Sequence, residues 1–141
     1  MSKTVAIQPP RIYPTFRYRD PAGMIDFLEK AFGFAVRARY GEGDRVDHSE
    51  LAFGSAMIML GGTRDDEFGS FVGSPDGNAG KSVYIAVDDA DAAFARAKAA
   101  GAEILREPFD TSYGSRDFIC ADPEGVVWCF GTYWPKASDP A

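Results

Sequence analysis

The sequence predicts an α+β fold in which two β-α-β-β-β modules form one curved mixed sheet, shaped like a cup. Three observations support this prediction. An alternating apolar stretch, an aspartate, an amphipathic stretch and a glycine follow one another in the same order in each half of the chain. The spacing is also repeated, since Gly33 follows Asp20 by 13 positions and Gly101 follows Asp88 by 13. Three further strand-like segments follow each glycine, so residues 1–141 are expected to form a single domain.

The first module is expected to span about residues 11–60, beginning with an alternating strand at 11–19. Asp20 and Pro21 favour the start of a helix, because aspartate caps a helix N-terminus and proline fits its first turn. Apolar residues then recur at helical spacing as far as Gly33, where the helix is expected to end. The other strands of this module are expected at 34–40, 46–53 and 56–60.

The second module, about residues 81–134, repeats this order after a glycine-rich segment, 61–80, that is expected to be a linker or a flap. A strand is expected first, and Asp88 and Asp89 then precede a helix that Gly101 ends. The strands of this module are expected at 81–87, 103–109, 116–121 and 126–133.

Charge and composition exclude several classes of partner. The chain has 15 Lys and Arg against 21 Asp and Glu, for a formal net charge of −6, which argues against nucleic acid. The chain has no apolar run near the length of about 20 residues that spans a membrane, and no signal peptide is evident, so a cytoplasmic protein is expected. With a single His, the two cysteines Cys120 and Cys129 are expected to be free thiols rather than zinc ligands.

The repeated module, the stretch "VDDADAAFARAKAAGAEI" and the later "DPEGVVWCFGTY" resemble the vicinal oxygen chelate superfamily, which includes glyoxalase, bleomycin resistance proteins and dioxygenases. The resemblance covers roughly residues 11–134 and implies a homodimer. In metal enzymes of that superfamily the ligands lie on the first and last strands of each module. The resemblance assigns these positions to Tyr13, Met59, Ser82 and Cys129.

Those four side chains are poor ligands for the divalent ions that such sites hold, because Zn, Ni, Mn and Fe favour imidazole and carboxylate. The resemblance is therefore closest in type to the metal-free, bleomycin-resistance-like binding proteins. Neither a metal nor another cofactor is expected.

Strand alternation indicates which side chains line the cup. Phe16, Tyr18, Trp128 and Phe130 are expected to face the helices. The expected ligand-binding residues are Tyr13, Arg17, His48, Glu50, Met57, Met59, Tyr84, Arg116, Phe118 and Cys129. Aromatic and thioether walls suit a planar, polarisable ligand, although the same pattern is also typical of ordinary core.

Several of these side chains have two interpretations. His48 and Glu50 could act as a general base and the group that orients it, or could form a polar pair at the rim. Arg17 and Arg116 could bind a carboxylate or phosphate of a ligand, or could pair with acidic residues of the chain. Phe68 and Phe71, in the segment 61–80, could close over a ligand or pack on a partner subunit.

Two functions follow from these observations. The first is a metal-free protein that binds a small aromatic compound and could sequester an aromatic or peptidic antibiotic; the acidic chain would attract a cationic compound. The alternative is a metal-dependent lyase, isomerase or dioxygenase with relocated ligands that include His48 and Glu50.

Overall fold

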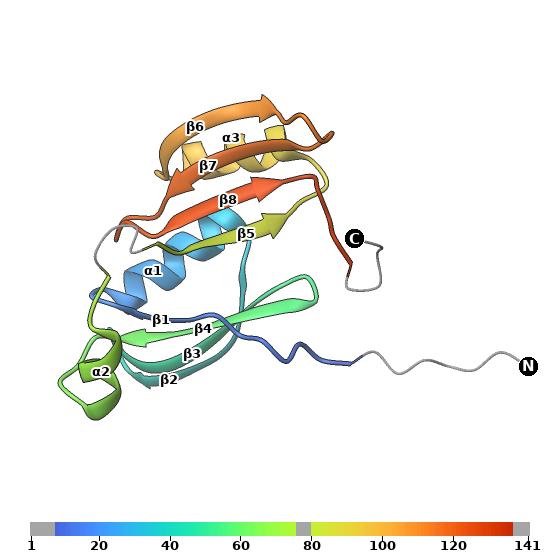
Figure 1. The fold of residues 1–141 in the computed structure, drawn as a ribbon. Coiled ribbons are helices and arrows are strands. Elements are labelled where there is room, and N and C mark those ends of the chain that lie inside the picture. The colour runs from blue at the N-terminus through green and yellow to red at the C-terminus, as the bar shows by residue number, and fades with distance from the viewer. Residues whose placement is uncertain (1–7, 76–79, 137–141) are drawn as a thin grey trace, which may run out of the picture.

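The computed structural model describes residues 8–75 and 80–136, and the two expected modules are confirmed (Figure 1). The first module contains β1 (Thr15–Tyr18), α1 (Pro21–Phe27), the π-helical turn η1 (Leu28–Phe32), β2 (Ala35–Glu42), β3 (Arg45–Phe53) and β4 (Ala56–Gly62). The second contains β5 (Ser82–Ala86), α3 (Ala90–Ala99), β6 (Glu103–Asp110), β7 (Arg116–Ala121) and β8 (Val127–Gly131). The short helix α2 (Glu67–Val72) lies between the modules in sequence.

Each module forms its own four-stranded mixed sheet, so the structure has two sheets where one continuous curved sheet was expected. The strand order is β1-β4-β3-β2 in the first sheet and β5-β8-β7-β6 in the second. The first and last strands of each module run parallel, and the other neighbouring strands are antiparallel. The two sheets are therefore copies of one topology, as the repeated sequence predicts.

Both helices begin and end where the sequence predicts. A carboxylate oxygen of Asp20 accepts a hydrogen bond of 3.0 Å from the amide of Gly23, and Pro21 occupies the first turn of α1. Asp89 caps α3 in the same way. Gly33 follows η1 with φ of 86°, a left-handed conformation that favours glycine.

The segment 61–80, expected to be a linker or a flap, contains more secondary structure than its glycine content suggests. Its first two residues complete β4, and Asp66 caps α2 by accepting a hydrogen bond from the amide of Gly69. Residues 76–79 lie outside the described part of the chain.

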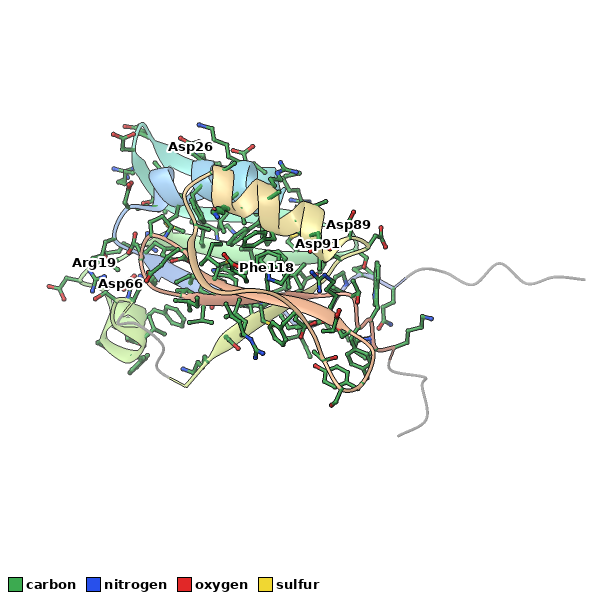
Figure 2. All side chains as sticks on the ribbon, turned by 90° about the horizontal axis from the view of Figure 1, so that it is seen from above. Arg19, Asp26, Asp66, Asp89, Asp91 and Phe118 are labelled. Carbon is green, nitrogen blue, oxygen red and sulfur yellow. The ribbon has the colours of Figure 1, made fainter. Side chains whose placement is uncertain are left out.

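The helices of the two modules lie side by side and share one hydrophobic core (Figures 1 and 2). Phe32 of η1 packs against two aromatic rings of β8, at centroid distances of 5.1 Å from Trp128 and 4.9 Å from Phe130. Arg96 of α3 donates hydrogen bonds to two carbonyl oxygens near the end of η1. The helix-covered faces of both sheets therefore pack against a common interior.

A second junction is built around the turn Asp122–Gly125. One carboxylate oxygen of Asp122 accepts hydrogen bonds from the Tyr18 hydroxyl (2.7 Å) and the Trp128 indole N–H (3.0 Å). Its other oxygen accepts hydrogen bonds from the backbone amides of Glu124 in the turn and of Val126 just after it. Glu124 accepts hydrogen bonds of 2.7 Å from the backbone amides of Arg19 and of the residue after it, at the start of α1. This turn of the second module thus fixes the backbone of the first module where α1 begins.

No helix in the described part of the chain is long and apolar enough to cross a membrane.

Candidate functional site

The face of each sheet that its helix leaves uncovered is called here its open face. On the first sheet, Thr15 of β1 lies beside Met59 of β4, and Met59 lies beside Glu50 of β3. A cavity of about 270 Å³ lies over this face and extends beneath α2. Its walls come from β1, β3, β4 and the segment that ends in α2, and include Thr15, Arg17, Asp47, His48, Met59, Arg64, Phe68 and Val72. The structure thus brings together three of the predicted site residues: Arg17, His48 and Met59.

Arg17 pairs with an acidic residue that the sequence analysis did not identify. Its two terminal nitrogens lie 3.2 Å from the two carboxylate oxygens of Asp66. Its guanidinium also lies over the ring of Phe68, 5.0 Å from the centroid, in a cation–π contact. Asp66 directly precedes the segment "EFGSFV", in which Phe and Val recur at helical spacing. Its place there is a helix-capping position, and this was the signal in the sequence that could have identified it.

His48 and Glu50 form the pair that their spacing on one strand face predicts. The Nε2 atom of His48 is 3.0 Å from a carboxylate oxygen of Glu50, while the other oxygen accepts a 2.7 Å hydrogen bond from Arg37. The hydrogen bond with His48, followed by the charge of Arg37, lowers the pKa of Glu50. The His48 ring stacks on Tyr40 at the edge of the sheet. A catalytic role for the pair stays a prediction.

The open face of the second sheet carries Tyr84 and Cys129, which lie directly opposite each other on β5 and β8. The Tyr84 hydroxyl donates a hydrogen bond of 2.7 Å to the carbonyl of Tyr133, and burial raises its pKa. Tyr84 and Met57 also line a second, more apolar cavity of about 260 Å³ between the modules, with Phe34, Phe53 and Trp134. Tyr13 precedes β1 and is half-buried.

Arg116 and Phe118 do not line the open face, and the expectation that they do was wrong. Phe118 is completely buried and stacks on Phe130 of β8, with its ring also against Phe94 of α3 (Figure 2). Arg116 lies on the same helix-covered face and pairs with Asp91 and Asp110. Cys120, on the same strand, is also buried in the core.

The reason for this error is the register of β7 against β8. Phe118 lies opposite Phe130 and Cys120 lies opposite Trp128. Residues directly opposite on neighbouring strands point to the same face of the sheet, so they share the face already occupied by Trp128 and Phe130. The register cannot be obtained from alternation within a single strand.

The residues at the metal positions that the resemblance implies do not fit a divalent ion. Thr15 rather than Tyr13 lies opposite Met59, and Tyr84 rather than Ser82 lies opposite Cys129. Whichever set is taken, the donors are hydroxyl, phenol, thioether and thiol instead of imidazole and carboxylate. In the described residues, no group of three or more His, Cys, Asp and Glu side chains is placed to hold a metal.

Both thiols are expected to react slowly with iodoacetamide at pH 8. Burial, and then the charge of Asp122, raises the pKa of Cys120 to about 12 from an ordinary value of 9.0, and burial raises that of Cys129. Since the thiolate is the nucleophile, alkylation in native buffer should be more than about tenfold slower than in denaturant. Rapid labelling of either cysteine in the folded protein, followed by mass spectrometry, would contradict this burial.

The raised pKa of Cys120 makes the free energy of unfolding depend on pH in the alkaline range. Above about pH 9 the unfolded Cys120 thiol loses its proton while the folded one keeps it, so the free energy of unfolding should fall as pH rises toward 12. Burial also raises the pKa of Tyr18, which acts in the same direction. Urea denaturation at several pH values should show this decline, and Cys120→Ala should make it shallower.

The comparisons with known proteins agree with this fold. A sequence model of the Glyoxalase/Bleomycin resistance protein/Dioxygenase superfamily matches residues 12–130. The uncharacterized protein Rv0887c of Mycobacterium tuberculosis H37Rv is 31% identical over 125 residues, covering 86% of this chain and 74% of that protein.

Solved structures of other proteins are also similar to this one, and two of them illustrate the likeness. The crystal structure of TioX from Micromonospora sp. ML1 has a TM-score of 0.72 and 30% identity, covering 86% of this chain and 97% of that one. A glyoxalase/bleomycin resistance protein/dioxygenase family enzyme from Burkholderia phytofirmans PsJN has a TM-score of 0.67 at 22% identity, covering 84% and 94%. At that identity the second likeness shows the fold alone.

Proposed function

The chain belongs to the glyoxalase/bleomycin resistance protein/dioxygenase superfamily, and from this premise we propose that it binds a small aromatic compound on the open face of its first sheet without a metal ion. The observation that carries the proposal is the set of side chains where the first and last strands of each module meet. Thr15 with Met59, and Tyr84 with Cys129, offer apolar and weakly polar contacts in place of metal ligands.

The cavity over the first sheet supports this class of ligand. Met59 presents a polarisable thioether, and Phe68 and Val72 of α2 supply an apolar wall opposite the sheet. Such walls suit a planar ring system. An aromatic or peptidic antibiotic is one compound of this class, and sequestering it would protect a cell without chemistry.

A homodimer is part of the same proposal. Within one chain, the helix-covered faces of both sheets pack against the shared core, which leaves the open faces directed away from it. Exposed aromatic side chains, among them Tyr84 and Phe71, remain available to a second copy. Sedimentation equilibrium over a range of concentrations would test this assembly.

The ligand test is a thermal-shift screen of planar aromatic compounds, including aromatic antibiotics. A compound at 100 times its dissociation constant should add about 2.7 kcal/mol to the free energy of unfolding. Met59→Ala should weaken binding about tenfold, or about 1.4 kcal/mol, because it removes apolar contact in the cavity. Leu105→Ala, at an exposed position on β6, is the matched control and should bind normally. If Met59→Ala bound the compound as tightly as the native protein does, the ligand would bind at a site other than this cavity.

The enzymatic alternative depends on the 3.0 Å contact between His48 and Glu50 at the edge of the same cavity. If these residues are relocated ligands, purified protein supplied with Ni, Zn, Mn or Fe should retain one of them stoichiometrically. His48→Ala should then abolish retention. Protein that retains none of these metals would support the binding protein.

A further inference from the structure

The helix α2 is held over the first cavity mainly through one carboxylate. None of its six residues is buried, and Phe71 is 75% exposed, so hydrophobic burial contributes little to its position. Asp66, the residue before the helix, caps it through the amide of Gly69. The same carboxylate binds Arg17 through both oxygens and also accepts a 3.2 Å hydrogen bond from Arg64. The fold of α2 and its attachment to the sheet therefore depend on the same carboxylate, which lies beside α2 in Figure 2.

Arg17 has the geometry of an oxyanion-binding residue. Its side chain is only 12% exposed and forms part of the cavity wall. Its planar guanidinium presents two N–H groups to two carboxylate oxygens, the forked arrangement with which arginine recognises carboxylates. The guanidinium also lies over the ring of Phe68, which places an apolar surface beside the charged group. A planar ligand carrying a carboxylate would find both contacts at once.

The local charge of this cavity differs from that of the whole chain. The chain carries a net charge of −6, yet two arginines, Arg17 and Arg64, line the cavity beside a single acidic residue, Asp47. The chain balances these guanidiniums with its own carboxylates, since Arg64 contacts both Asp66 and Asp47. Hydrogen bonding from Arg17, and then from the Gly69 amide, lowers the pKa of Asp66 to about 2. Asp66 is thus ionised at neutral pH and occupies the anion position.

We propose that Asp66 stands in for a carboxylate of the ligand: an aromatic carboxylate pairs with Arg17 and displaces Asp66, which removes the cap of α2 while Phe68 and Val72 stay against the aromatic ring. This inference rests on the proposed function and names the ligand class for the same face. Because Asp66 is attached to the chain, it competes at an effective concentration in the millimolar range. The native protein therefore binds the carboxylate more weakly than a variant without this competitor, and α2 loses its cap when the ligand enters.

The test compares 2-naphthoate with its neutral isostere 2-naphthamide. Isothermal titration is done on the native protein, Asp66→Asn and Arg17→Gln. Asparagine can still cap α2, so Asp66→Asn removes the competing charge while keeping the helix start. We expect Asp66→Asn to bind 2-naphthoate at least about tenfold more tightly than the native protein does, with 2-naphthamide unchanged. Arg17→Gln should remove the preference for the carboxylate.

Asp91→Asn is the matched control, because Asp91 also pairs with an arginine, Arg116, far from this cavity. It should leave both affinities unchanged. Hydrogen exchange supplies a second readout: 2-naphthoate should accelerate exchange at the amides of Gly69 and Gly73 in the native protein. Circular dichroism and thermal melting would confirm that each variant is folded.

The outcomes separate the two proposals. Equal binding of 2-naphthoate and 2-naphthamide in every variant would contradict recognition of a carboxylate by Arg17. The proposal that the cavity binds an aromatic compound would then still stand. Slower exchange in α2 on binding would overturn the loss of its cap. If Asp66→Asn bound neither probe at about 10 mM, the carboxylate subsite would be wrong, and the aromatic screen with Met59→Ala would decide the proposed function independently.

Discussion

Asp122→Ala is expected to lower the free energy of unfolding by about 3–5 kcal/mol. Asp122 is only 3% exposed, and its carboxylate accepts four hydrogen bonds. Alanine would leave the Tyr18 hydroxyl and the Trp128 indole without that acceptor inside the core. A buried donor that loses its partner costs about 1–3 kcal/mol, which exceeds the worth of the bond itself. Chemical denaturation followed by circular dichroism measures the loss.

Asp26→Ala is the control, since Asp26 is exposed on α1 (Figure 2). A surface change of this kind should alter stability by less than about 0.5 kcal/mol. A double-mutant cycle with Tyr18→Phe should reveal coupling between Tyr18 and Asp122, because they share a bond. Additive effects in that cycle, or a small loss from Asp122→Ala, would mean that this junction does not hold the modules together.

Phe32→Ala is the second large effect, with an expected loss of about 3–5 kcal/mol. Phe32 is 5% exposed and belongs to the first module, yet it packs on Trp128 and Phe130 of the second. Removing the ring creates a cavity where the two modules meet, so the apolar area and the packing are lost together. Hydrogen exchange should show faster exchange in β8 as well as in η1.

Phe71→Ala provides the same chemical change at an exposed position of α2. It should leave the global stability nearly unchanged. Equal losses for Phe32→Ala and Phe71→Ala would contradict the assignment of the core. Loss of exchange protection confined to η1 would show that the two modules unfold separately.

Local signals in the sequence predicted the modules and the helix limits correctly. Asp20 and Asp89 cap their helices, and Gly33 ends the first, because capping depends only on neighbours in the chain. Alternation likewise placed Tyr18 and Trp128 against the helices, where both are buried. These features need no knowledge of which strands are neighbours.

The features that the sequence did not reveal depend on distant pairing. Phe118 was assigned to the wrong face because its orientation follows from its partner Phe130 on β8. The partner of Arg17 was missed because Asp66 lies 49 residues away and approaches only once α2 folds. The contact between His48 and Glu50 was predictable, because side chains two positions apart on one strand lie on the same face of the sheet.

The turn Asp122–Gly125 makes the two copies of the duplicated module unequal. In the first copy the corresponding strands, β3 and β4, are joined by Gly54 and Ser55 alone, whereas in the second Glu124 reaches across to the backbone where α1 begins. The second module therefore completes the first through these hydrogen bonds. A fragment that ends near residue 62 would lack this support, and fragment complementation, rather than independent folding, is the behaviour that the asymmetry implies.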